Sequence, residues 1–161
     1  MVFSKKNYFL LISILGIALI ILSGCGGSSN NTINDVNETN DQVVANNELD
    51  TFLNAWKNED VLSMGNALSN DFVEIGTDGE QTKKDNYILV WYSAFASGLN
   101  VNEVTFTNRL NENISPNFIK VSGQLYVEVI NTYGYKIEST DSVQFNIKKI
   151  NGVWYITKIV Y

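Results

Sequence analysis

The sequence predicts an α+β domain in which three N-terminal helices pack on one face of a curved antiparallel sheet. Two periodicities support this prediction. Between residues 43 and 98 apolar side chains recur every three or four residues, as in amphipathic helices, and after residue 98 they alternate with polar ones, as in half-buried strands. With 161 residues, of which 45% are hydrophobic and 12% aromatic, the chain is long and apolar enough for one compact domain.

The first two helices are predicted from an apolar stripe and a capping residue. The spacing i, i+3, i+4, i+7 is typical of a helix with one buried face. Four apolar residues fit this spacing: Leu49, Phe52, Leu53 and Trp56. Asp60 then has a side chain suited to the N-cap of a helix. We therefore expect a long helix, a break near residue 59 and a short second helix.

A short strand and a third helix are expected next. Residues 71–75 are predicted to form the strand, closed by a glycine-rich turn at 76–79. The string 82–85, Thr-Lys-Lys-Asp, predicts a capping box that opens the third helix, and Gly98 suits its C-terminal end. The apolar residues expected to face inward from this helix are Ile88, Trp91, Tyr92 and Phe95.

The rest of the chain alternates with the period of strands. On the strand that follows Gly98 we expect Arg109 to lie on the outer face. The alternate residues are expected on the covered face: Val104, Phe106, Asn108 and Leu110. A long strand follows at 118–130, with alternate apolar side chains on its covered face. The dipeptide Asn151-Gly152 is a strong signal for a two-residue hairpin, which would pair Ile147 with Ile156 and Lys149 with Trp154.

Composition excludes several classes of function. The chain has no histidine and one cysteine, which excludes histidine-based triads, histidine metal ligands, internal disulfides and cysteine-rich zinc sites. A formal net charge of −6 argues against binding to a nucleic-acid backbone. We expect no metal and no cofactor.

The N-terminus has the three parts of a secretory signal. Lys5 and Lys6 precede an apolar run at 8–22, which is shorter than the roughly 20 residues needed to cross a bilayer. The run ends in Leu22-Ser23-Gly24-Cys25. This string resembles the lipobox of bacterial lipoproteins, in which the cysteine is linked to diacylglycerol and becomes the mature N-terminus. An uncleaved signal anchor is the alternative.

The lipobox resemblance implies three segments. Residues 1–24 would be a signal peptide, residues 25–42 the lipidated Cys25 and a flexible polar tether, and residues 43–161 the folded domain. The domain would then lie outside the cytoplasm in the bacterial cell envelope, anchored to a membrane by its acylated cysteine.

Two further strings resemble the NTF2-like (SnoaL-like) superfamily. The first ends the first helix, with Ala55, Trp56, Asn58 and Asp60, and the second lies in the closing hairpin, with Gly152, Trp154 and Ile156. The resemblance implies a cone in which the sheet wraps around a cavity beside the helices. The superfamily includes ketosteroid isomerases, dehydratases and many members without catalysis, so the fold does not decide the function.

Candidate site residues are mostly aromatic. A ligand pocket in the cone could be lined by Trp56, Trp91, Tyr92, Phe95, Asn108 and Trp154, although aromatic side chains at such spacing equally form a core. Glu74, with Asp71 as a second candidate, is the residue suited to act as a general base at the mouth of the cavity, and a solvated acid at the sheet edge is the commoner role for such a residue.

Three functions therefore stay open, one of which is a purely structural component of the cell envelope that works through the sheet face. The leading hypothesis is a non-catalytic module that binds a small apolar ligand or a protein partner. The alternative is a SnoaL-like or ketosteroid-isomerase-like isomerase or lyase that acts on a small hydrophobic substrate. The outer face of the sheet, with Tyr126 and Tyr155, is expected to form a homodimer or to bind a protein partner, since NTF2-like relatives often dimerise through that face.

Replacing the lipobox cysteine tests the anchor directly. Cys25→Ala should release the protein from the membrane fraction or stall its processing, because the thiol that carries the lipid is gone. Fractionation of cells expressing each form measures this. Cleaved, membrane-bound Cys25→Ala protein would contradict the lipoprotein hypothesis.

Overall fold

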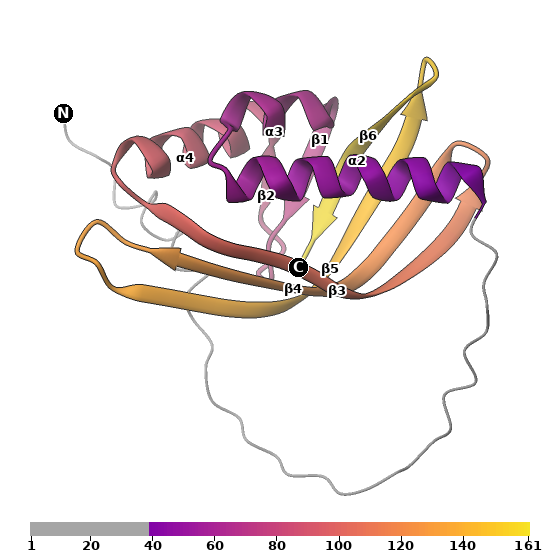
Figure 1. Ribbon diagram of the computed structural model, residues 1–161. Helices are drawn as coiled ribbons and strands as arrows, with labels where there is room; N and C mark the ends of the chain where they lie inside the picture. The colour runs from indigo at the N-terminus through magenta and orange to yellow at the C-terminus, as the bar shows by residue number, and fades with distance from the viewer. Residues whose placement is uncertain (1–38) are drawn as a thin grey trace, which may run out of the picture.

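Residues 39–161 are described by the computed structural model, so the lipobox with Cys25 and nearly all of the predicted tether lie outside the described residues. The described chain forms three helices and six strands (Figure 1). In chain order they are α2 (Asn40–Lys57), α3 (Val61–Ala67), β1 (Leu68–Ile75), β2 (Gln81–Lys83), α4 (Lys84–Ala96), β3 (Asn100–Ser115), β4 (Phe118–Ile130), β5 (Lys136–Ile150) and β6 (Val153–Val160). The α+β class predicted from the sequence is confirmed.

The six strands form one sheet in the order β2-β1-β6-β5-β4-β3. Neighbouring strands are antiparallel with one exception, since β1 runs parallel to β6. The prediction of a purely antiparallel sheet is therefore wrong at this pair. The chain between β1 and β6 passes through α4 and four strands, so no tight turn forces these two strands to be antiparallel. None of the helices in 39–161 is long and apolar enough to cross a membrane.

The helix ends differ from the sequence prediction in two places. Helix α2 begins at Asn40, inside the predicted tether, because Thr39 and Gln42 form a reciprocal capping box. The capping box predicted at Thr82 is absent, because Thr82 belongs to the short strand β2 and Lys83 occupies the N-cap of α4 without a side-chain cap. Asp60 caps α3 as predicted, accepting a hydrogen bond from the Ser63 amide at 3.0 Å.

A bulge in β3 overturns the predicted assignment of its faces. Thr107 pairs with Gln124 and Leu110 with Ser122, so two residues of β3 stand where one would keep the register. Asn108, at φ 54°, is exposed, and Leu110 is 73% exposed, although both were predicted to face inward. Arg109 turns instead to the helix-covered face, where it forms an ion pair with Asp50 of α2 and lies over the Phe106 ring at 5.2 Å.

The last hairpin matches the prediction as far as Ile156. Asn151 and Gly152 both have positive φ, and the predicted pairs Ile147–Ile156 and Lys149–Trp154 form. The register then shifts between Asn146 and Ile147. Before the shift, even-numbered residues of β6 such as Ile156 face the core, and after it odd-numbered residues such as Ile159 do. Simple alternation would place Tyr161 on the outer face, but because of the shift it packs against the core.

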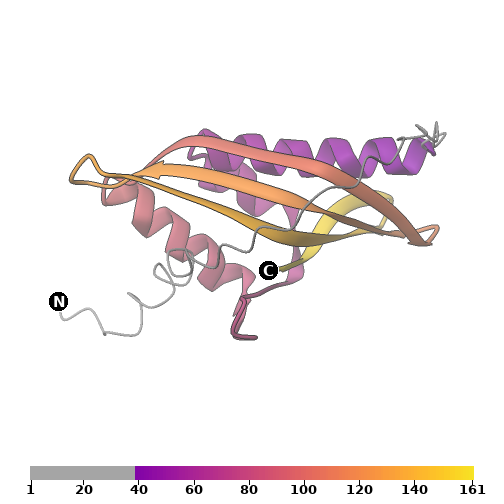
Figure 2. The ribbon, with the colours of Figure 1, turned by 90° about the horizontal axis from the view of Figure 1, so that it is seen from below.

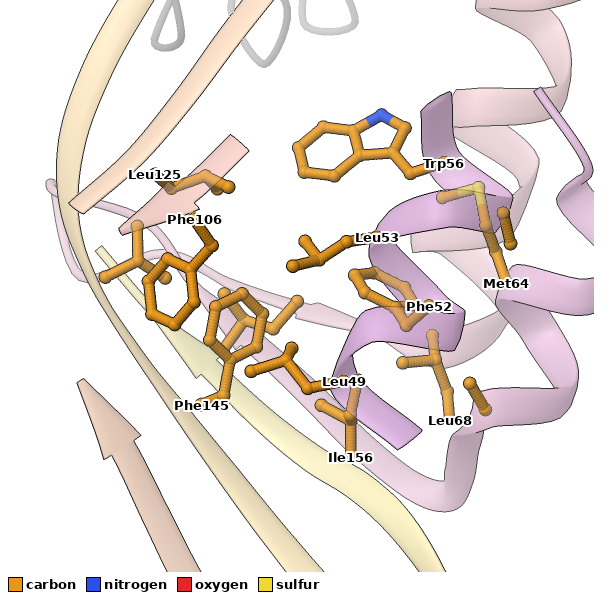
Figure 3. Packing of buried hydrophobic residues seen from close by; sticks show 14 of the residues in the cluster. Leu49, Phe52, Leu53, Trp56, Met64, Leu68, Phe106, Leu125, Phe145 and Ile156 are labelled. Carbon is orange, nitrogen blue, oxygen red and sulfur yellow. The ribbon is translucent and has the colours of Figure 1, made fainter. Parts of the chain in front are cut away.

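The core lies between α2 and the concave face of the sheet. Leu49, Phe52 and Leu53 of α2 point toward Phe106 and Phe145 of the sheet (Figure 3). Phe145 meets the Phe106 ring edge-on at 5.1 Å and the Phe52 ring at 6.5 Å between centroids. This packing holds the long strands curved around the helix, as a view from below also shows (Figure 2).

The β3 bulge depends on a glycine in the neighbouring strand. A Cβ on Gly123 would lie 2.6 Å from the carbonyl oxygen of Thr107 and 2.7 Å from the Phe106 ring. We predict that Gly123→Ala lowers the free energy of unfolding by about 1–3 kcal/mol, because the bulge and the ring must both shift.

Gly65 of α3 provides the matched control. A Cβ there would meet only Ile88, at an ordinary 3.7 Å. Gly65→Ala should therefore raise the free energy of unfolding by about 0.5–1 kcal/mol, since alanine reduces the entropy of the unfolded chain. Urea unfolding measures both variants, and equal effects of the two substitutions would contradict this account of the bulge.

Candidate functional site

Three titratable side chains meet on the inner face of the sheet: Glu74 of β1, Tyr87 of α4 and Tyr161 after β6. We call these three residues the Glu74 cluster. Glu74 shares the inner face of β1 with Phe72, whose ring lies 5.2 Å from that of Tyr87. The amide of Tyr161 donates to the carbonyl oxygen of Ile75 at 3.1 Å, which brings the end of the chain beside β1.

Burial controls the electrostatics of the cluster. It raises the pKa of Glu74 to about 7. The pKa values of Tyr87 and Tyr161 also rise well above 10, in both cases chiefly through removal from water. The charges of Tyr161 and then Glu74 add to the rise at Tyr87, and the charge of Glu74 adds to the rise at Tyr161. The charge of Asp141 on β5 adds to the effect at Tyr161. At neutral pH the tyrosines are therefore neutral hydrogen-bond donors beside a carboxyl group that changes charge.

The Tyr87 hydroxyl and the indole N–H of Trp56 are buried and have no hydrogen-bond partner within residues 39–161. The indole N–H of Trp91 lies close enough to the Tyr87 hydroxyl to oppose the rise of the tyrosine pKa. The two groups do not have the geometry of a hydrogen bond, however. Buried polar groups in folded proteins are nearly always paired, so two orphans in one region call for a functional explanation.

Aromatic rings connect these two groups. The Trp91 ring meets the Trp56 ring edge-on, with 4.8 Å between the ring centroids. Its centroid also lies 6.4 Å from that of Tyr87 and 5.5 Å from that of Phe95. The structure thus brings together three of the residues predicted to line a pocket, Trp56, Trp91 and Phe95. The nitrogen of the Trp56 indole points away from Leu53 and the core beneath it (Figure 3).

Other predicted site residues lie elsewhere. Tyr92 is 61% exposed, because the buried stripe of α4 runs through Tyr87, Trp91 and Ala94 and leaves Tyr92 on the solvent side. The β3 bulge leaves Asn108 exposed, as described above. Trp154 is buried, but it lies beneath Lys149, whose Nζ is 5.5 Å from its ring.

The two acids proposed as catalytic candidates have different surroundings. Asp71 is exposed and accepts a hydrogen bond from the Ser69 hydroxyl at 2.6 Å, outside the Glu74 cluster. Glu74 is partly buried, unlike the solvated edge acid that is the commoner case. Glu74 is therefore the carboxyl group with the surroundings of a proton acceptor.

Sequence reasoning missed Tyr87 and Tyr161. The spacing 87, 91, 94 is helical and could have identified Tyr87 as part of the buried stripe. No local signal marks Tyr161, because its face depends on the register shift in β6. Within residues 39–161 no group of three or more acidic or cysteine side chains could hold a metal ion.

Comparison with solved structures shows the fold. The chain is similar to an NTF2-like protein from Cytophaga hutchinsonii, with 20% identity, a TM-score of 0.63 and coverage of 76% of this chain and 97% of that one. It is also similar to a ketosteroid isomerase-like protein from Erwinia carotovora atroseptica, with 16% identity, a TM-score of 0.66 and coverage of 76% and 95%. No family model and no curated protein matches the sequence. At these identities the similarity shows that the chain has the NTF2-like fold.

The raised pKa of Glu74 predicts a pH dependence of stability. The folded state keeps a proton on Glu74 up to about pH 7, whereas the unfolded chain releases it near the ordinary value of 4.5. This contribution to the free energy of unfolding is therefore present below pH 4.5 and is lost as pH rises toward 7 and above, by roughly 2–3 kcal/mol. Glu74→Gln should remove this fall and be more stable than the parent at pH 8.

Urea unfolding between pH 4.5 and pH 8 measures the effect. Glu80→Gln, which removes an exposed carboxylate of the turn after β1, is the matched control and should keep the pH dependence of the parent. If Glu74→Gln and Glu80→Gln gave the same pH profile, burial of the Glu74 carboxyl group would be refuted.

Proposed function

We propose that the protein is a lipid-anchored, extracytoplasmic lipoprotein whose NTF2-like domain binds a small, largely apolar molecule carrying one neutral hydrogen-bond acceptor. One observation carries the proposal. The Tyr87 hydroxyl and the Trp56 indole N–H are both buried without a hydrogen-bond partner among the described residues. Each lost hydrogen bond of this kind costs on the order of 1–3 kcal/mol, which an acceptor on a bound ligand would recover.

The charges of the site favour a neutral acceptor over an anion. Glu74 and Asp141 both act on Tyr161, so a carboxylate ligand would meet two acids. A ketone, ester or amide oxygen accepts from Tyr87 or Trp56 without that repulsion. The aromatic side chains of Trp91 and Phe95 would contact the apolar part of such a ligand.

A second function is favoured by Glu74 itself. A carboxyl group with a pKa of about 7 beside a neutral tyrosine donor suits proton abstraction next to a carbonyl group, with Tyr87 donating to the oxygen as negative charge develops. The chain would then be an isomerase or lyase acting on a small hydrophobic substrate.

The anchor and the partners of the domain are part of the same proposal. The lipobox string at 22–25 supports attachment to the membrane through Cys25. The outer sheet face supports self-association or a protein partner. There Tyr126 donates toward Glu128 and Glu138 at 2.9 and 3.1 Å, and Tyr155 lies opposite Lys148. A domain that stays monomeric at high micromolar concentration in sedimentation would count against self-association.

Two naphthalene probes of similar size test ligand binding. 2-Acetylnaphthalene carries a ketone oxygen and 2-ethylnaphthalene does not, and quenching of tryptophan fluorescence reports the binding of each. Tyr87→Phe should weaken binding of the ketone about 5- to 10-fold, the effect of one hydrogen bond, and leave the hydrocarbon unchanged. Tyr135→Phe, an exposed tyrosine, is the matched control. Failure of both probes to bind, or equal effects of Tyr87→Phe on both, would refute the proposed site.

The same ketone separates binding from catalysis. If Glu74 is a general base, the protein should accelerate deuterium exchange into the acetyl methyl group in D2O, and Glu74→Gln should abolish the acceleration. Nuclear magnetic resonance follows the exchange. Binding of the ketone without accelerated exchange would support the non-catalytic module.

A further inference from the structure

One end of the domain combines exposed apolar residues with the point where the described chain begins. Helix α2 starts there, and the turn between β3 and β4 and the turn between β5 and β6 lie beside it (Figures 1 and 2). Lys149 of β5 connects these parts, since its amide donates to the Asn117 carbonyl oxygen at 2.9 Å and its Nζ contacts Asp41 at 3.0 Å. We call this region the tether end.

The tether end exposes aliphatic side chains on each of its parts. They are 37–51% exposed, and they are Val43 and Val44 of α2, Ile114 of β3, Ile150 of β5 and Val153 of β6. Ile150 and Val153 flank the two-residue turn and form a small apolar tip. Aliphatic groups on adjacent tips suit shallow insertion into the boundary between lipid headgroups and acyl chains.

Charge distinguishes the tether end from the opposite end of the sheet. Lys120, Lys148 and Lys149 lie at the tether end, with Glu112 and Asp41 paired to two of them. At the opposite end three glutamates form one row across the strands, Glu103 beside Glu128 and Glu128 beside Glu138, and Lys136 bridges the last two. An anionic lipid surface would therefore attract the tether end and repel the glutamate row.

The length of the preceding segment favours the same orientation. Fourteen residues, 26–39, separate Cys25 from α2, and at full extension they span at most about 50 Å. The thirteen residues of β4 alone extend over about 43 Å. A lipid on Cys25 thus keeps the tether end within about 50 Å of the bilayer, whereas the glutamate row, a further strand length along the sheet, can lie almost twice as far away.

We propose that the tether end is a membrane-docking surface: the tips around Ile150 and Val153 enter the interface of the anchoring bilayer while Lys148 contacts anionic headgroups. The inference rests on the lipid anchor of the proposed function. It gives the domain a preferred orientation, with the β4–β5 hairpin and the glutamate row directed away from the membrane.

Quenching by brominated lipid tests this orientation on the full lipoprotein. A label needs a free thiol, and a lipidated Cys25 has none, so a bimane dye would react only at an introduced cysteine. Val153→Cys places the dye at the tether end, and Tyr133→Cys places it on the β4–β5 hairpin, where the side chain is 83% exposed. In vesicles of phosphatidylcholine and phosphatidylglycerol, the dye at 153 should be quenched at least about twofold more than the dye at 133.

Vesicle flotation, measured first, separates failure of the anchor from failure of the docking surface. Protein that does not float refutes the anchor and this inference with it. Protein that floats but shows equal quenching at both positions, or stronger quenching at 133, refutes the docking surface and leaves the anchor intact.

Lysine variants of the Val153→Cys protein test the electrostatic part. Adding Lys148→Gln should reduce the extra quenching that phosphatidylglycerol produces, because one contact to anionic headgroups is lost. Lys57→Gln, at the far end of α2, is the matched control and should leave it unchanged. Equal responses of the two variants would contradict a role for Lys148.

Discussion

The inward positions of Arg109 and Tyr161 depend on two of the register shifts in the sheet. The bulge at Asn108 and Arg109 forms only because Gly123, on the next strand, has no Cβ to meet the Thr107 carbonyl and the Phe106 ring. The shift in β6 then places Tyr161 on the inner face. Since strand side chains alternate with a period of two, each shift reverses every assignment beyond it. The Arg109–Asp50 pair and the place of Tyr161 in the Glu74 cluster follow from these shifts.

A carboxyl group inside such a fold is costly to keep charged. The sheet and α4 remove Glu74 from water, and no described cation lies against it to offset the loss, so its pKa rises to about 7. The same burial keeps Tyr87 and Tyr161 protonated. A group that can accept a proton thus lies beside groups that can donate a hydrogen bond, which serves ligand recognition and proton transfer equally well. The unpaired Tyr87 hydroxyl is what turns this arrangement into a candidate site.

The two ends of the sheet have separate roles in the proposed arrangement. The tether end exposes aliphatic side chains and lysines. The opposite end carries the glutamate row, in which Lys136 pairs with Glu128 and Glu138. The Glu74 cluster lies on the helix-covered face of the sheet. It is therefore separate from both the outer sheet face and the tether end. Anchoring, self-association and ligand binding can therefore occur together on one domain of modest size.

Local pattern by itself determined the α+β class, the apolar stripe of α2, the covered face of β4 and the pairing of Ile147 with Ile156, because each depends on residues close in sequence. It also offered Glu74, Trp56, Trp91 and Phe95 as candidate site residues, and the structure brings the three aromatic residues together. Only the tertiary structure decided that Arg109 faces inward, that Tyr92 and Asn108 face solvent and that β1 runs parallel to β6. Each depends on contacts between segments distant in sequence: the β3 bulge against Gly123 turns Arg109 inward and Asn108 outward, the packing of α4 on β1 leaves Tyr92 in solvent, and the long connection allows β1 to pair parallel with β6.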